Sequence, residues 1–145
     1  ALLPGNSSGR VSYLPWVLFT DPELAQVGLT KSEAEAKYAS AARTTDWPFS
    51  KNDRAHTEDN PAGQIQIIHH KNGKILGATL LGKHAGELIN EWALAISNQM
   101  RISDMAYALH AYPTYGLANM QLAAEIQSRS TLEGIAGKIL RALAG

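Results

Sequence analysis

The sequence contains no cysteine in its 145 residues. A disulfide framework, a cysteine-ligated zinc site and a thiol nucleophile are therefore excluded within this chain. An excess of one charge is lacking too, because 13 lysines and arginines balance 13 aspartates and glutamates, which argues against nucleic-acid binding and a polybasic membrane patch. No apolar run approaches the roughly 20 residues that a membrane-spanning helix needs. We expect no nucleic acid and no membrane among its partners, and a cytoplasmic protein.

Sequence fingerprints of dinucleotide binding are also missing, since neither G-x-x-x-x-G-K-[ST] nor G-x-G-x-x-G occurs. The chain begins Ala-Leu-Leu-Pro-Gly, with no initiator methionine and without the basic and apolar regions of a signal peptide. We therefore expect an excised piece of a longer protein. Within it, residues 1–12 are expected to form a linker from missing upstream domains and residues 13–145 to form one domain.

Periodic apolar positions predict the strands. Residues 64–68 alternate in polarity and residues 74–81 form a second extended run, and the Asn72-Gly73 pair between them favours a hairpin with a type I′ turn. Gly77, inside the second run, indicates a bulge or close packing. Further strands are expected from Trp16 onward and over residues 41–47.

Capping signals and apolar stripes predict the helices. Thr20–Glu23 and Thr30–Glu33 each place a capping residue three positions before a glutamate, which predicts a helix start at the first and a helix to Tyr38 at the second. Residues 85–96 carry the apolar stripe of a long helix. Helices are also expected over residues 103–109 and 115–127, and the pair Ser130–Glu133 predicts a separate last helix over residues 132–143, closed by Gly145. These elements predict an α+β domain in which a small antiparallel sheet carries helices on one side.

The histidines before residue 110 do not form a convincing metal site. Adjacent residues of a strand point to opposite faces, so His69 and His70 cannot chelate one ion together and are predicted to be surface residues. His56 has no periodic partner in its polar surroundings. His84 and Glu87 are spaced to share a helix face, but the helix dipole alone favours a glutamate in the first turn. We expect no metal site.

The densest chemistry lies in residues 110–115, which read HAYPTY. An imidazole, two phenols and a proline fall between two predicted helices, and loops of this kind often carry function. The alternative is a rigid turn between helices, with a tyrosine in the core and Thr114 as a helix N-cap.

Five motifs in and before this loop follow one another in the order found in a known enzyme family. They are FTDPELAQVGLT at 19–30, NDRA at 52–55, GKILGA at 73–78, AGELINE at 85–91 and HAYPT at 110–114. With these motifs the chain resembles the C-terminal dimerisation domain of the flavin-dependent pyridine nucleotide–disulfide oxidoreductases, which include dihydrolipoamide dehydrogenase, glutathione reductase and mercuric reductase. Arg54, within the second motif, is expected to pair across the sheet or across a dimer.

The resemblance implies an antiparallel sheet of about five strands with flanking helices, in a domain that forms a homodimer interface. It implies that FAD and NAD(P) bind to upstream domains of the same chain, so that the isolated fragment binds neither and is inert. The HAYPT loop is then expected to reach the flavin and the redox-active cysteine pair of the partner subunit, with His110, Tyr112 and Pro113 facing the partner's FAD. The Tyr112–Pro113 peptide bond is expected to be cis, as in relatives.

The sequence departs from the family pattern H-x-H-P-T-x-x-E at two positions. Tyr112 replaces the second histidine, which is the family's acid/base, and Leu117 replaces the glutamate that orients it. A phenol with an ordinary pKa near 10 is a poor base at neutral pH. Tyr112 and His110 remain the candidate catalytic residues of the full-length enzyme, with Tyr112 as a hydrogen-bond donor toward the dithiol and His110 as a loop-shaping residue.

Two other functions stay open on the sequence alone. One is a freestanding protein-binding module without an enzymatic parent, and the other is a self-contained enzyme that uses His110 with Tyr112. An upstream glycine-rich dinucleotide motif together with a C-x-x-x-x-C pair would favour the interface domain. A native reading frame that begins near Ala1 would favour the freestanding module.

Overall fold

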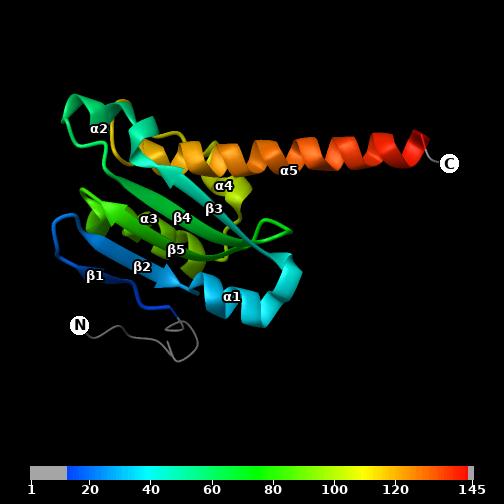
Figure 1. Ribbon diagram of the computed structural model, residues 1–145, viewed down its shortest axis with the longest axis horizontal. Helices are drawn as coiled ribbons and strands as arrows, with labels where there is room; N and C mark the ends of the chain where they lie inside the picture. The colour runs from blue at the N-terminus through cyan, green and yellow to red at the C-terminus, as the bar shows by residue number, and fades with distance from the viewer. Residues whose placement is uncertain (1–12, 144–145) are drawn as a thin grey trace.

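The computed structural model describes residues 13–143, so the predicted linker over residues 1–12 and the predicted closing residue Gly145 lie outside the described residues. It confirms an α+β fold with a five-stranded antiparallel sheet, in the order β1-β2-β5-β4-β3, and flanking helices (Figure 1). The strands are β1 (Trp16–Leu18), β2 (Leu24–Gly28), β3 (Ala42–Pro48), β4 (Gly63–His70) and β5 (Ile75–Gly82). The helices are α1 (Lys31–Tyr38), α2 (Asp53–Thr57), α3 (Ala85–Ser97), α4 (Ile102–Tyr107) and α5 (Leu117–Leu143).

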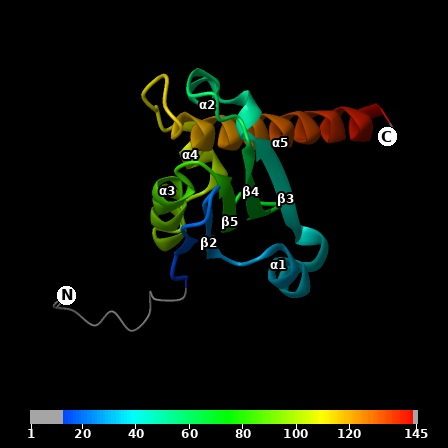
Figure 2. The ribbon, with the colours of Figure 1, turned by 60° about the vertical axis from the view of Figure 1, so that its left-hand side comes forward.

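Both faces of the sheet carry helices, whereas the sequence pattern predicted helices on one side only. The main core lies between one face and the helices α3, α4 and the first half of α5, where Trp92 and Leu80 are fully buried. On the other face, Ala34 of α1 packs against Ile68 and Leu76. Figure 2 shows α3 and α1 on opposite sides of the sheet. A large part of the second face therefore stays without a helical cover.

The hairpin of β4 and β5 is confirmed, but the predicted turn type is wrong. The backbone nitrogen of Gly73 donates to the carbonyl of His70 at 2.8 Å, and Gly73 has a φ of 88° while Asn72 keeps a negative φ. A type I turn followed by a left-handed glycine fits these values, and a type I′ turn does not. At Gly77 both expected features occur, because the strand register shifts beside it and a Cβ there would collide with the backbone of Leu29.

Residues 20–23 form no helix, contrary to the prediction. They make the turn between β1 and β2, which contains a cis Asp21–Pro22 peptide bond. Glu23 instead accepts a hydrogen bond from the backbone nitrogen of Gly86 at 2.8 Å, which places a carboxylate at the start of α3, where the helix dipole favours it.

Strand β2 was missed in the residue pattern because four of its five residues are non-polar, which hides the alternation between its two faces.

Only one of the three predicted capping boxes forms. At α1 the backbone nitrogen of Glu33 donates to Thr30 Oγ1 at 3.3 Å, and the backbone nitrogen of Thr30 donates to Glu33 Oε2 at 2.8 Å. The pair Ser130–Glu133 lies inside α5, which runs unbroken through the two helices predicted separately. Thr131 Oγ1 donates to the carbonyl of Gln127 at 3.0 Å, so a hydroxyl here bonds within the helix without ending it.

Candidate functional site

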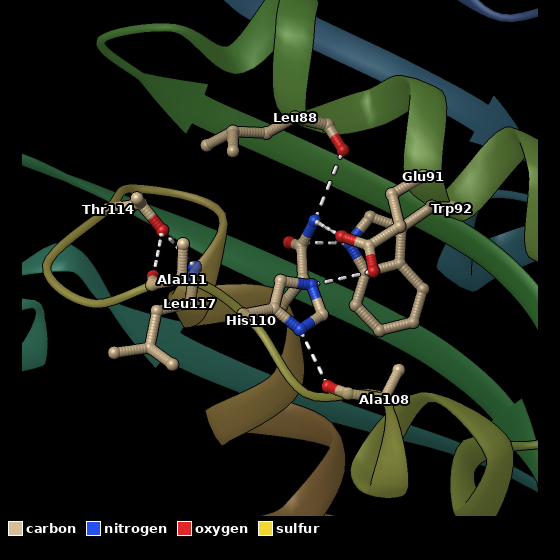
Figure 3. Close-up of polar contacts among 9 residues, drawn as sticks. Leu88, Glu91, Trp92, Ala108, His110, Ala111, Thr114 and Leu117 are labelled. Atoms are coloured by element: carbon tan, nitrogen blue, oxygen red, sulfur yellow. Dashed lines mark hydrogen bonds and ion pairs between the residues drawn. The ribbon is translucent and has the colours of Figure 1, made fainter.

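The HAYPT loop connects α4 to α5 and lies beside α3 (Figure 3). Its Tyr112–Pro113 peptide bond is cis, which confirms the prediction. Ala111, Tyr112 and Pro113 are exposed, whereas only 15% of the His110 side chain is exposed. The structure therefore presents the middle of the loop to the outside and holds its first residue against the domain.

A partly buried polar network holds His110. Its Nε2 lies 2.8 Å from Glu91 Oε1 on α3, and its Nδ1 lies 2.7 Å from the carbonyl oxygen of Ala108 (Figure 3). Asn119, which is fully buried on α5, donates through Nδ2 to Glu91 Oε2 at 2.7 Å and accepts a hydrogen bond from Trp92 Nε1 at 2.8 Å. The network joins α3, the loop and α5 through side chains that lie far apart in the sequence.

The same contacts engage both ring nitrogens of His110. Nε2 faces a carboxylate oxygen of Glu91, and Nδ1 faces the carbonyl oxygen of Ala108. The second oxygen of Glu91 accepts from the fully buried Asn119. His110 therefore anchors the loop and presents neither ring nitrogen to the outside.

The second end of the loop is held by capping interactions. Thr114 Oγ1 donates to the carbonyl of Ala111 at 2.7 Å and accepts from the backbone nitrogen of Leu117, the first residue of α5, at 3.2 Å. Thr114 thus makes the side-chain hydrogen bond that is typical of an N-cap, in the turn that leads into α5. Asn52, which is fully buried, donates through Nδ2 to the carbonyl of Thr114 at 3.1 Å. Leu117 itself is buried in the domain and has no polar group to orient a neighbour.

Tyr112 is the residue of the loop that points outward, with 70% of its surface exposed. Its hydroxyl donates to Asp53 Oδ2 on α2 at 3.0 Å. This hydrogen bond, together with the negative charge of Asp53, raises the pKa of Tyr112 above its ordinary value of 10.0. The phenol is therefore protonated at neutral pH and serves as a hydrogen-bond donor.

A second charged cluster lies at the same end of the domain. Glu58 accepts hydrogen bonds from Lys83 Nζ at 2.6 Å and from Arg54 Nε at 2.6 Å, and these two bonds lower the pKa of its carboxyl group to about 2. Arg54 thus pairs with Glu58, four residues further along the chain, and the expected pairing across the sheet does not occur among the residues that the structure describes. The hydroxyl of Tyr115 lies 3.5 Å from Glu58 Oε2, which brings the cluster next to the loop.

The remaining histidines differ partly from expectation. His69 is buried, so its prediction as a surface residue is wrong, and burial lowers the pKa of its ring. It lines a cavity of about 350 Å³ between the end of the sheet and α5. The ring of His84 packs edge-on against Tyr115, with 4.9 Å between ring centroids. Within residues 13–143, no group of three or more histidine, aspartate and glutamate side chains is placed to hold a metal ion.

Three residues of the site were not assigned a role by the sequence reasoning: Glu91, Asn119 and Asp53. Two of them do lie within motifs that the sequence shares with the family, since Glu91 closes the AGELINE motif and Asp53 belongs to the NDRA motif. Their place in these shared motifs could have indicated a role for both residues. Asn119 has no such signal, because its role depends on the way α5 packs against α3.

Comparisons with known proteins agree with this architecture. The family model of the pyridine nucleotide-disulphide oxidoreductase dimerisation domain matches residues 14–123. Among curated relatives, the mitochondrial dihydrolipoyl dehydrogenase of Rattus norvegicus is 41% identical over 103 residues, which cover 70% of this chain and 20% of that protein. The dihydrolipoyl dehydrogenase of Staphylococcus aureus is 38% identical over 122 residues, which cover 81% of this chain and 26% of that protein.

Solved structures lead to the same conclusion. LpdA from Mycobacterium tuberculosis superimposes with a TM-score of 0.72 and 28% identity, over 78% of this chain and 25% of that chain. The HOCl-induced flavoprotein disulfide reductase RclA from Escherichia coli shares the fold, with a TM-score of 0.75 and 22% identity over 82% of this chain and 27% of that chain. The chain spans about a quarter or less of the length of these relatives. It belongs to the pyridine nucleotide-disulphide oxidoreductase family and carries the dimerisation domain of that family.

Proposed function

We propose that this domain forms the homodimer interface of a FAD-dependent NAD(P)H–disulfide oxidoreductase and contributes its HAYPT loop to the flavin and dithiol site of the partner subunit. The observation that carries the proposal is the loop itself, which is fixed at both ends and exposed in the middle. His110 is held by Glu91 and Ala108, Thr114 caps α5, and Tyr112 extends outward between them. A fixed, outward-pointing loop of this kind suits a site that a second subunit completes.

Tyr112 and Pro113 present the chemistry that the partner's site would meet. The phenol ring and the proline offer exposed apolar surface. The phenol hydroxyl has one proton, which it donates to Asp53 in the single chain, and under this proposal it turns that proton toward the partner's site on assembly. These groups fit the edge of an aromatic prosthetic group and a neighbouring thiolate, which accepts hydrogen bonds. When bound, FAD would supply electron transfer between NAD(P)H and a disulfide, which is reduced to a dithiol.

The loop's own residues divide two tasks. His110 positions the loop through its contacts with Glu91 and with the carbonyl of Ala108, which engage both ring nitrogens. Tyr112 donates from a phenol whose raised pKa keeps it protonated. Under this proposal no residue of the loop acts as a general base, so Tyr112 stabilises negative charge on sulfur or flavin and does not remove a proton.

The proposal assigns FAD and NAD(P) to upstream domains of the same chain, and it takes the isolated fragment to bind neither and to be catalytically inert. A homodimer is the natural partner arrangement for a dimerisation domain. No helix in the described part of the chain is both long and apolar enough to cross a membrane, and we propose a cytoplasmic location.

The flavin spectrum of the intact flavoenzyme tests whether the loop reaches the cofactor. We expect Tyr112→Phe to shift the visible absorption of the flavin, because it removes a hydrogen-bond donor at that site. Tyr107→Phe is the matched control, since Tyr107 is also largely exposed but lies in α4. Identical spectra for the wild type and both variants would contradict the proposal.

A further inference from the structure

The second half of α5 carries an apolar stripe that nothing in the domain covers. Beyond the sheet the helix continues on its own, as Figures 1 and 2 show. Leu132, Ile135, Ile139 and Leu143 are 66%, 50%, 54% and 81% exposed. Four large aliphatic side chains at this level of exposure on one helix are costly in water.

The stripe does not continue the face by which α5 is attached. In the first half of the helix, Leu122 and Ile126 are buried against the core. At about 100° per residue, the side facing the domain next carries Arg129 and Glu133, and Glu133 Oε2 lies 3.9 Å from Arg43 Nη1 of β3. The apolar stripe lies about a third of a turn away from that side. The rest of the domain lies on the side of Arg129 and Glu133, so it does not reach the apolar stripe. A partner for the stripe has to come from outside the domain.

The spacing of the stripe matches a second copy of itself. Its steps of three, four and four residues are those of a helix-packing seam. If two such helices run antiparallel around a two-fold axis near residue 137, Leu132 of each copy faces Leu143 of the other. Ile135 of each copy then faces Ile139 of the other. All four side chains find an apolar partner in one register, which is the property of an isologous interface.

We propose that residues 132–143 of α5 form an antiparallel helix pair with the same segment of a second copy, as an additional contact of the dimer. The inference rests on the proposed homodimer, which supplies the second copy. The match to the family's dimerisation domain ends at residue 123, so this pair is an interface feature of the chain beyond that match.

Engineered disulfides test the helix pair directly, because residues 1–145 contain no cysteine and peptide mapping of the covalent dimer separates the new disulfide from the dithiol proposed for the upstream domains. Leu132→Cys and Leu143→Cys change exposed residues, so both variants are expected to fold. In the antiparallel pair the two positions meet across the axis, whereas two copies of Leu132 lie about 16 Å apart along the helix, beyond disulfide reach. Mixing the two single variants under oxidation is expected to give a covalent dimer, and each variant alone to give at least about tenfold less. Equal yields in the mixture and in either variant alone would contradict the pairing.

Sedimentation equilibrium of the full chain separates this inference from the proposed function. Ile135→Glu/Ile139→Glu is expected to weaken the dimer at least about tenfold, while Ser130→Glu, on the opposite side of the helix, leaves it unchanged. A dimer unaffected by the double variant, without mixed disulfide, overturns the helix pair alone. A mixed disulfide combined with complete loss of the dimer in the double variant supports the helix pair and overturns the domain interface proposed above. Binding of the stripe to phosphatidylcholine–phosphatidylglycerol vesicles by a monomer would overturn both.

Discussion

His110 shows how much of the site depends on single residues from distant elements. Its position follows from Glu91 on α3 and from Asn119 on α5, and the sequence motif around the loop names neither partner. The motif was sufficient to predict the loop and its cis Tyr112–Pro113 bond, which the structure confirms. It was insufficient for the partners, because side-chain contacts between elements have no fixed spacing in the sequence.

The contact between Glu91 and His110 should be measurable as stability. We expect Glu91→Gln to lower the free energy of unfolding by about 1–3 kcal/mol, because it weakens the hydrogen bonds from Glu91 to the largely buried His110 and to the fully buried Asn119. Urea denaturation is the measurement, and Glu87→Gln, on the exposed side of α3, is the control. A loss no larger than the control's would contradict the anchoring role of the pair.

Asp53 should set the titration of Tyr112. Because the hydrogen bond and the charge of Asp53 raise the pKa of Tyr112, we expect Asp53→Asn to move the ionisation of this phenol to lower pH. The phenolate absorbance of Tyr112 is obtained by subtracting the titration of a Tyr112→Phe variant from that of the parent. An unchanged titration in Asp53→Asn would show that the contact is absent in solution.

Glu58 gives a pH dependence with a defined sign. Its pKa falls from an ordinary 4.5 to about 2 in the folded chain, so it stabilises the fold above pH 4.5. That stability is lost as the pH falls from about 4.5 to about 2, because the unfolded chain binds the proton first. We expect Glu58→Gln to flatten the stability profile in this window. A profile as steep as that of the parent would contradict the contact with Lys83 and Arg54.

At the scale of elements, apolar periodicity predicted strands and helices reliably, whereas capping patterns did not predict where helices start. The hairpin and α3 were predicted from periodicity close to their observed bounds, and the strand expected over residues 41–47 corresponds to β3. Two capping patterns out of three gave wrong helix starts, because a threonine or serine before a glutamate also occurs in turns and inside helices. The separate last helix was one such error, since α5 continues through Ser130.

Gly77 tests the packing between β5 and the segment after β2. We expect Gly77→Ala to cost about 2 kcal/mol or more, because its Cβ would collide with the backbone of Leu29. Gly134→Ala is the matched control, since a Cβ there meets nothing within 4 Å and alanine is favoured in helices by about 1 kcal/mol. Thermal unfolding monitored by circular dichroism measures both. A stable Gly77→Ala variant would contradict the close approach of the two backbones.

At the scale of the whole molecule, the family resemblance predicted more than the residues did. The residue pattern indicated four strands, and the resemblance supplied the fifth, which the structure confirms as β2. The helix α1 was predicted, but its place on the second face was not, because Ala34 is its only buried residue and it carries no apolar stripe. Exposed apolar side chains remain on β1, on the HAYPT loop and on α5. These are the surfaces that the proposed dimer would bury.

The most direct test is dilution of the full-length protein, which we propose to be a dimeric flavoenzyme, through the concentration at which the dimer dissociates, with flavin fluorescence and sedimentation recorded on the same samples. Our account predicts that flavin emission changes at the same protein concentration at which the dimer dissociates, because the partner's HAYPT loop leaves the flavin. It also predicts a smaller change for Tyr112→Phe. Flavin emission that stays constant while the dimer dissociates would contradict the account.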